Sequence, residues 1–344
     1  EPGHFRFHCF GEKIFHLETQ LGYQHRGVEE LILKQKNLNS CLIESIAGDS
    51  LIAYATTYCN ALEALSDTHI TRKAMKIRGI GLEMERIAVH LGDLSGISND
   101  IAYLLGNSVF GAIRTVVINS MLELCGSRFG KSLIQLGGVG FNIDRDLGQK
   151  LKKNLKKVLK KVHLMEETLF NAPSVISRLE QTGTIQKQDA EKIGMVGPAG
   201  RASGVSIDVR VDHSYGIYQY YPVYKFALES GDVFARTYMR FLEIQKSIEL
   251  IEEIIDYLGE KEALIKDMPG LSSSAMVISM VEGWRGEIVH AALTDSTGKL
   301  KKYKIKDPSF NNWYGLTLAV KNNGISDFPL SNKSFNLSYC GFDL

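Results

Sequence analysis

Long stripes of apolar residues at helical spacing constrain the fold of this chain more than any other feature of its sequence. Over residues 72–94 the stripe consists of side chains three or four positions apart, namely Ile77, Ile80, Met84, Ile87 and Leu91. That spacing puts them on one face of a helix, which must bury the face against other elements. Similar patterns predict further helices over 50–65, 108–124, 147–169 and 233–258. Long helices in succession are typical of a helical bundle.

Strand-like patterns lie near the two ends of the sequence. Residues 1–20 alternate around a glycine turn at Gly11 and predict a β-hairpin. The turn-forming residues 294–298 predict a second hairpin, because strand-like segments flank them. The strands expected in this part of the chain cover 276–281, 287–293 and 300–305.

We therefore expect an α+β fold that is mostly α, with a central bundle of long helices, a small N-terminal β-hairpin and C-terminal β elements. The chain is expected to form one domain over 1–344. In it a hairpin over 1–20 precedes a helical core over 26–260, and β elements with an extended tail occupy 275–344. Residues 194–222 contain glycine and proline among charged and aromatic residues and predict a long irregular loop. Such loops in compact proteins are usually functional or disordered.

The charge balance narrows the classes of partner. The formal net charge is only +1, whereas proteins that bind nucleic acid concentrate positive charge on one face, so we expect no nucleic acid partner. The helix predicted over 147–169 does carry seven lysines between Lys150 and Lys161. These lysines form the solvated face of an amphipathic helix, or else they contact anionic lipid headgroups or an acidic partner.

Other sequence signals bear on the compartment and on metal binding. No run reaches the roughly 18 uninterrupted apolar residues of a membrane span, and the first residues lack the order of a signal peptide, so we expect a cytoplasmic chain. The cysteines are scattered and never spaced as C-x-x-C: Cys9, Cys41, Cys59, Cys125 and Cys340. That pattern argues against a disulfide framework and against a self-contained zinc or iron–sulfur site.

Short motifs spread over the whole sequence carry a family likeness. In chain order they include Glu1-Pro2-Gly3-His4-Phe5-Arg6, Leu21-Gly22-Tyr23-Gln24-His25-Arg26-Gly27-Val28-Glu29, Glu83-Met84-Glu85-Arg86-Ile87, Gly126-Ser127-Arg128, Val196-Gly197-Pro198, Arg201-Ala202-Ser203-Gly204, Gly231-Asp232-Val233 and Glu282-Gly283-Trp284-Arg285-Gly286-Glu287. In this order they resemble the large subunit of group 4, formate-hydrogenlyase-type [NiFe]-hydrogenases and, slightly less, the 49-kDa-type subunit of complex I. The resemblance implies a central helical bundle that packs against a small subunit with a [4Fe–4S] cluster.

The cysteines that hold nickel and iron in these hydrogenases are missing from the matching positions. Soft metals at low potential need thiolate ligands, and the family supplies them as two C-x-x-C pairs. By the resemblance, the first pair corresponds to Ala47 and Ser50, and the second to Ser338 and Gly341, with Cys340 one place out of register. Alanine and glycine side chains bind no metal, and neutral serines are poor ligands for nickel. The likeness therefore implies a variant that holds no nickel or iron and no cofactor of its own.

Complex I lacks the same cysteines and uses the vacated cavity for a quinone headgroup. The tyrosine that contacts quinone in complex I corresponds to Gly48, and the histidine of its hairpin corresponds to Pro2, so both are absent here. The carboxylate that pairs with this histidine corresponds to Asp100. Quinone is thus a candidate acceptor for which the chain keeps part of the residue set.

The resemblance points to four candidate catalytic residues. Glu29 matches a glutamate that relays protons, Arg285 matches an arginine above the open metal position, and Tyr54 replaces a histidine of the metal cavity. Together with Asp100 they are expected to supply protons and a fixed positive charge to an acceptor in the vacated cavity. Each also has a structural alternative: a helix-terminal charge for Glu29, a packed phenol for Tyr54, and an ion pair for Arg285.

Two functions are consistent with these residues. As an enzyme subunit, the chain forms one wall of a cavity beside an iron–sulfur subunit that delivers electrons to a quinone or similar acceptor. As a non-catalytic scaffold, it couples a redox module to antiporter-like, ion-pumping membrane subunits. Either role implies peripheral association with the cytoplasmic membrane. A polar, water-filled cavity favours the enzyme, and a cavity plugged by Tyr54, Leu51 and Phe335 favours the scaffold.

Overall fold

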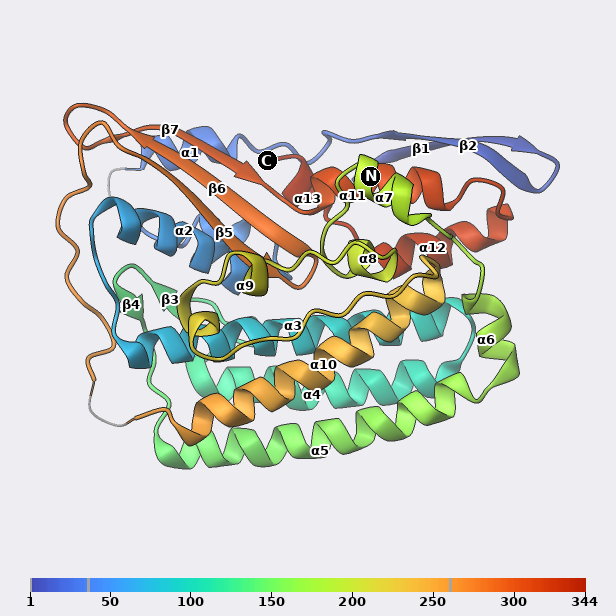
Figure 1. Cartoon of the computed structure of the whole chain (residues 1–344), viewed down its shortest axis with the longest axis horizontal. Helices are drawn as coiled ribbons and strands as arrows, with labels where there is room; N and C mark the ends of the chain where they lie inside the picture. The colour runs from blue at the N-terminus through green and yellow to red at the C-terminus, as the bar shows by residue number, and fades with distance from the viewer. Residues whose placement is uncertain (1, 36–37, 260–261) are drawn as a thin grey trace.

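Four long helices run side by side in the computed structural model, which describes residues 2–35, 38–259 and 262–344 (Figure 1). They are α3 (Arg72–Asp100), α4 (Leu104–Cys125), α5 (Arg145–Phe170) and α10 (Val233–Asp256). Helix α3 packs against α4 and α10, and α5 packs against the same two helices. The predicted bundle is confirmed. Glu1 and residue 260, at the ends of two predicted ranges, lie outside the described residues.

Side-chain caps fix where three of these helices begin. Thr71 before α3, Asp144 before α5 and Asp232 before α10 each accept a hydrogen bond from an amide of the first helical turn. Such caps satisfy amide donors that have no partner inside the helix. Helix α4 ends at Gly126, whose left-handed backbone, with φ of 72°, is open to glycine without steric cost.

A three-stranded antiparallel sheet covers one side of α2 (Leu51–Leu65), and α3 lies on another side of the same helix. The sheet has the order β5 (Met276–Gly283), β6 (Gly286–Thr294) and β7 (Leu300–Lys306), and α1 (Val28–Lys34) packs on β7. Almost every side chain of α2 is buried as a result. The fold therefore encloses α2, the helix that directly follows Ala47 and Ser50, the first pair of positions that the resemblance matches to metal ligands.

The predicted N-terminal hairpin is confirmed, since β1 (His4–Phe10) pairs antiparallel with β2 (Lys13–Gln20). The predicted extended C-terminal tail is wrong. The last residues form α12 (Phe328–Phe335) and α13 (Tyr339–Phe342), which follow α11 (Ser309–Ala319), and these helices lie next to the hairpin in Figure 1. A second apolar core explains why this region is folded rather than extended. Trp313 and Phe335 from these helices are buried in one cluster with Ile14 and Leu17 of the hairpin.

The segment 194–222 is more ordered than the irregular loop that was predicted. It contains α8 (Gly197–Ala202), α9 (Val209–Asp212) and a short 3-10 helix at Gly216–Gln219. Gly197 has φ of 65°, and a Cβ atom there would overlap the backbone carbonyl of Arg285. Only glycine lets α8 begin so close to the turn between β5 and β6.

The remaining elements are short connections between these parts. They are β3 (Ile134–Gln135), β4 (Gly138–Val139), α6 (Pro173–Leu179), α7 (Lys187–Lys192) and the 3-10 helices Ile43–Ser45 and Ile325–Asp327. Among the described residues, α4 alone is long and apolar enough to cross a membrane by length and composition. A single helix of this kind is weak evidence, because core helices of soluble proteins pass the same test.

Candidate functional site

The first pair of positions that the resemblance matches to metal ligands, Ala47 and Ser50, lies just before α2, and both residues are buried. A carboxyl from α3 contacts this helix end: Glu85 accepts hydrogen bonds from the amides of Ile52 at 2.7 Å and Ala53 at 3.2 Å. These amides have no partner within the helix, so the oxygens of Glu85 satisfy them. Glu85 is thus a neighbour of the vacated site that the sequence did not single out.

Arg285 forms a bidentate ion pair with Asp49, between the two lost positions of the first pair. Its terminal nitrogens lie 2.8 Å and 2.6 Å from the two carboxylate oxygens, and its Nε donates to the backbone carbonyl of Asn336. The guanidinium also stacks on the ring of Trp284 at 4.0 Å. Burial opposes ionisation of Asp49, but the charge and hydrogen bonds of Arg285 outweigh it and lower the pKa of this carboxyl. The geometry therefore agrees with the structural alternative for Arg285, which is an ion pair.

A second polar pair fills the space beside the C-terminal lost ligands. The hydroxyl of Tyr54 donates a short hydrogen bond to Asp307. A Cβ atom on Gly341 would lie 2.5 Å from Oδ2 of the same aspartate, and the Ser338 hydroxyl caps α13 by accepting from the Gly341 amide. A cysteine at position 341 would therefore displace Asp307. These residues do not fit a nickel ion.

Tyr54 is completely buried. Burial and the neighbouring Asp307 raise the pKa of its phenol well above the ordinary value, although Arg285 acts in the opposite direction. The phenol therefore stays protonated near neutral pH. Because its hydroxyl has a hydrogen-bond partner, Tyr54 agrees with the structural alternative of a buried, packed phenol.

The structure does not bring all four candidate residues together. Glu29 accepts a hydrogen bond from the amide of Ile305, pairs with Lys304 and lines a surface hollow that also includes Asp307 and Gly341. Asp100 is exposed at the last position of α3. It lies 15 residues beyond Glu85, or about 22 Å along the helix axis at 1.5 Å per residue. Among the described contacts, none joins Asp100 to Tyr54 or Arg285.

A hollow opens on the other side of the Arg285–Asp49 pair, between α3, α4 and the start of α2. Its water-accessible volume is about 30 Å³. Its charged lining residues are Asp49, Glu85, Arg114 and Arg128, and the rest of its wall is largely apolar, with Gly48, Met84, Ala88, Val89, Val117, Ile118, Met121 and Phe129. Burial and the neighbouring Asp49 raise the pKa of Glu85 to about 8, despite the two amide hydrogen bonds. The hollow thus combines an apolar wall with a carboxyl that holds a proton at neutral pH.

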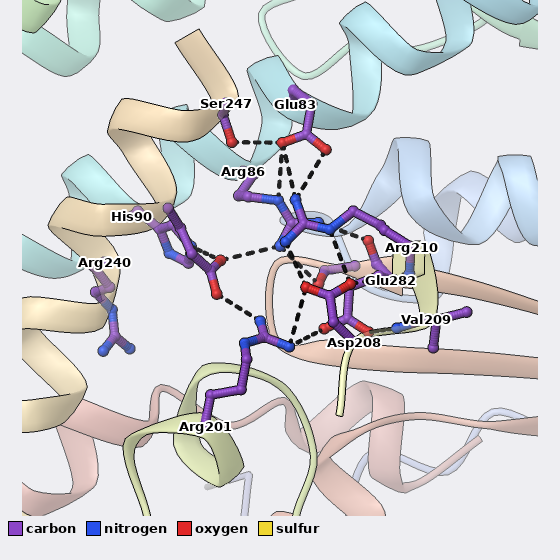
Figure 2. Close-up of polar contacts among 12 residues, drawn as sticks. Glu83, Arg86, His90, Arg201, Asp208, Val209, Arg210, Arg240, Ser247 and Glu282 are labelled. Atoms are coloured by element: carbon purple, nitrogen blue, oxygen red, sulfur yellow. Dashed lines mark hydrogen bonds and ion pairs between the residues drawn. The ribbon is translucent and has the colours of Figure 1, made fainter. Parts of the chain in front are cut away.

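A larger cluster of charged side chains is buried between α3, α8, α9, α10 and β5 (Figure 2). It contains four carboxyls, three guanidiniums and one imidazole, none more than 5% exposed: Glu83, Asp208, Glu243, Glu282, Arg86, Arg201, Arg210 and His90. Buried charges persist only when they are paired and hydrogen-bonded. The cluster therefore joins elements that are far apart in the sequence.

Arg201 links two of the carboxyls, as Figure 2 shows, by donating to Glu243 and, at 2.7 Å, to Glu282. Arg86 donates to Glu243 at 3.2 Å and to the backbone carbonyl of Glu282 at 2.8 Å. Arg210 pairs with Asp208 at 2.7 Å. Guanidinium groups suit such bridges because their donors form a planar fork.

The sequence marked most of these cluster residues only through family motifs, and it did not mark Glu243. A more direct signal is present on α3, where Glu83, Arg86 and His90 are spaced three and four residues apart and so share one helical face. Charged residues on a helix of mostly buried residues indicate partners from other elements. The partners themselves, on α8, α9 and β5, were visible only in the structure. In the loop predicted over 194–222, Arg210 is buried in an ion pair, whereas Asp212 and His213 are exposed.

Within residues 2–35, 38–259 and 262–344, no three His, Cys, Asp or Glu side chains gather so that they could hold a metal ion. The cysteines in this part of the chain are all free thiols.

Comparison with known proteins gives a consistent set of relatives. The family model of the respiratory-chain NADH dehydrogenase 49-kDa subunit matches residues 106–276. The carbon monoxide-induced hydrogenase of Rhodospirillum rubrum is 27% identical, over 96% of this chain and 92% of that protein. An NADH-quinone oxidoreductase subunit of Chloroherpeton thalassium is 30% identical, over 92% of this chain and 78% of that protein.

Two further comparisons bear on length and fold. Formate hydrogenlyase subunit 5 of Escherichia coli is 26% identical, and the match covers 98% of this chain but only 60% of that protein. A chain in the structure of the membrane-bound sulfane sulfur reductase, an archaeal respiratory membrane complex, superposes with a TM-score of 0.92 at 22% identity. The superposition covers 99% of this chain and 94% of that chain and confirms the predicted fold class.

Proposed function

Because this chain belongs to the family of the respiratory-chain NADH dehydrogenase 49-kDa subunit, we propose that it is the large subunit of a membrane-associated redox complex related to complex I and to group 4 hydrogenases. In this role it helps to pass electrons from the [4Fe–4S] cluster of a partner subunit to a quinone or a similar acceptor. The other partners are antiporter-like membrane subunits, and the chain sits peripherally on the cytoplasmic side of the membrane. Support comes from relatives named as hydrogenase, formate hydrogenlyase and NADH-quinone oxidoreductase subunits.

The proposal excludes nickel–iron chemistry in this chain. All four ligand positions lack a thiolate, and Asp307 stands where a side chain at Gly341 would extend. The test is elemental analysis of the purified complex. We expect iron from the partner subunit and no stoichiometric nickel, so one nickel per complex that survives chelation contradicts this part of the proposal.

One observation carries the catalytic part of the proposal: a small, largely apolar hollow has two carboxyls, Asp49 and Glu85, and two guanidiniums, Arg114 and Arg128, in its wall. Its volume is about 30 Å³, so the proposal requires the hollow to widen when the complex assembles and the acceptor binds. Binding sites for organic ligands are mostly apolar and have a few polar groups that fix orientation. Two-electron reduction of a quinone-like acceptor also consumes two protons, and a general acid must lie within hydrogen-bond reach of the acceptor or of a bridging water. Glu85 holds a proton near neutral pH, while Arg285 keeps Asp49 ionised.

The assembled complex provides the test of this assignment. Replacing Glu85→Gln removes the acidic proton but keeps a neutral side chain of similar shape. We expect acceptor reduction to slow by about tenfold or more, the lower end of what general acid catalysis contributes. The matched control is Glu123→Gln, which changes an exposed glutamate paired with Lys150 on the surface of α4.

The scaffold role has an observation of its own in its favour. Tyr54, Leu51 and Phe335 are all buried, and the Tyr54–Asp307 pair fills the former metal cavity. If Glu85→Gln and Asp49→Asn both leave electron transfer and ion translocation at full rate, the hollow is not the acceptor site. The scaffold then replaces the enzyme as the function of this chain.

A further inference from the structure

The buried charged cluster contains an odd number of charges. Its four carboxyls are Glu83, Asp208, Glu243 and Glu282, and its three guanidiniums are Arg86, Arg201 and Arg210. We propose that this cluster is a binding site for one exchangeable proton, and that Glu282 is the residue that carries it. This proposal does not depend on the nature of the acceptor, because it concerns the charge balance of the cluster alone.

Three of the four carboxyls are held in the ionised form by several donors each. Glu243 accepts from Arg86, from Arg201 and from the Nε2 of His90. Glu83 accepts from both Arg86 and Arg210, as well as from the hydroxyls of Tyr218 and Ser247. Hydrogen bonds and opposite charges of this kind favour a carboxylate over a carboxylic acid.

Asp208 belongs to the same group. Its two oxygens accept from the Nε of Arg210 at 3.0 Å and from a terminal nitrogen of the same guanidinium at 2.7 Å. It also accepts from the backbone amide of Arg210 at 3.0 Å. A carboxylate with two charged donors and an amide donor has little tendency to bind a proton.

His90 does not supply the missing positive charge. Its Nε2 donates to Glu243 at 2.8 Å, but its Nδ1 is buried and has no hydrogen-bond partner. The ring packs at a right angle against Trp284, with ring centroids 6.0 Å apart. A protonated imidazole would place a second N–H in this apolar contact without an acceptor, which is costly for a buried charged group. The histidine is therefore neutral, and burial lowers its pKa.

Of the four carboxyls, Glu282 is the least strongly paired with positive charge. Its Oε1 shares the Nη1 of Arg201 with Asp208, at 2.7 Å and 3.6 Å, and its Oε2 accepts only the amide of Val209 at 3.2 Å. The other charged or titratable groups that face it from the packed elements are Arg86, Arg210, Glu243 and Tyr215. Burial and the nearby negative charge of Asp208 raise the pKa of Glu282 to about 7.

The position of Glu282 connects the proton to the rest of the site. It precedes Gly283, Trp284 and Arg285 in the sequence, so the β5 strand leads directly from the cluster to the Arg285–Asp49 pair. Arg86 holds this turn by donating to the backbone carbonyls of Glu282 and Gly283. Uptake or release of a proton at Glu282 therefore changes the charge beside the strand that positions Arg285.

The first test is infrared spectroscopy of the assembled complex in the Glu85→Gln background, which removes the other carboxylic acid expected near neutral pH. At pH 6 we expect a carboxylic-acid band that disappears on adding Glu282→Gln and persists on adding Glu287→Gln, the matched control on the same hairpin. The band should titrate near pH 7. A band that survives Glu282→Gln, or that does not change between pH 5 and pH 9, overturns the proposal.

The second test is the pH dependence of thermal unfolding of the same complexes. The folded-state pKa of Glu282, about 7, lies above its ordinary value of 4.5, so the stability that its proton contributes is complete below pH 4.5 and lost as the pH rises through 7. Glu282→Gln keeps a neutral group at every pH. The variant should therefore match the parent near pH 4.5 and melt at a progressively higher temperature than the parent as the pH rises from 4.5 to 9. A variant that fails to fold at pH 6 contradicts a neutral Glu282, and so does a difference that is independent of pH.

Discussion

The region that the resemblance matches to the metal site includes Arg285, in the turn between β5 and β6, and the buried charged cluster includes Glu282, near the end of β5, yet the two regions hold charge in different ways. At the metal site each polar group has one dominant partner: Arg285 pairs with Asp49, and Tyr54 donates to Asp307. In the cluster each guanidinium pairs with at least two carboxyls. The first region thus contains two local pairs, whereas the cluster is a network that joins several elements.

Solvent exposure separates the two regions further. The side chain of Asp49 is 41% exposed, whereas no charged side chain in the cluster pairs exceeds 6%. Salt screens exposed charges strongly and buried ones much less. Tyr54 and Asp307 are as buried as the cluster, so this difference concerns the Arg285–Asp49 pair. We infer that this pair is adaptable and the cluster rigid, and the following substitutions test the comparison between the two regions.

The largest effect is expected from Glu243→Gln in the cluster. The substitution removes the negative charge that Arg86, Arg201 and His90 share, and it leaves buried guanidiniums without compensation. Breaking a buried ion pair from one side costs about 3–5 kcal/mol. Thermal unfolding of the assembled complex measures the loss. A change below about 1 kcal/mol, within the range of exposed ion pairs, would show that the cluster is not rigid.

Restoring a side chain at the second lost ligand pair should have the next largest effect. In Gly341→Cys the new Cβ meets Oδ2 of Asp307 at 2.5 Å, so the Tyr54–Asp307 pair must move. Overpacking of this kind costs about 1–3 kcal/mol. The matched control is Gly48→Ala, because a Cβ atom there meets no atom within 4 Å. Equal melting temperatures for the two variants would mean that the cavity is not filled as described.

Removing the phenolic hydroxyl with Tyr54→Phe should cost less. Asp307 loses the donor to its Oδ2 but keeps the Ser309 amide on Oδ1 at 2.7 Å. We expect a loss of about 1 kcal/mol, the low end for a buried acceptor deprived of one partner. Thermal unfolding is again the measurement, and the matched control is Tyr58→Phe, which removes a buried hydroxyl of the same helix that has no hydrogen-bond partner among the described residues. A Tyr54→Phe variant as stable as the parent would indicate that the pair does not help to hold α2 in place.

The smallest effect is expected from Asp100→Asn at the exposed end of α3. Surface substitutions usually change stability by less than about 0.5 kcal/mol. Since no described contact joins Asp100 to Tyr54 or Arg285, acceptor reduction by the assembled complex should also stay near the parent rate. A tenfold slower rate with unchanged stability would show instead that a partner subunit completes a second site around this carboxylate.

The sequence by itself determined the helical bundle, the hairpin, the family and the lack of thiolates. Apolar stripes such as Ile77 to Leu91 predict helices because their period is local, and the loss of ligands at Ala47, Ser50, Ser338 and Gly341 depends only on residue identity. The same local patterns also predicted the three C-terminal strands, although they extend slightly beyond the predicted limits. Family likeness then placed Arg285 and Tyr54 near one cavity.

Only the tertiary structure decided which of these groups form hydrogen bonds and ion pairs with each other. Glu85 binds amides of α2 that are more than 30 residues away, Tyr54 finds Asp307 across 253 positions, and Arg201 and Glu282 are 81 residues apart. Helical and strand periods carry no information about such pairs. A buried charge is stable only if its counter-charge and hydrogen-bond partners arrive from other elements, so its pKa and its function follow from packing of the whole chain rather than from any segment.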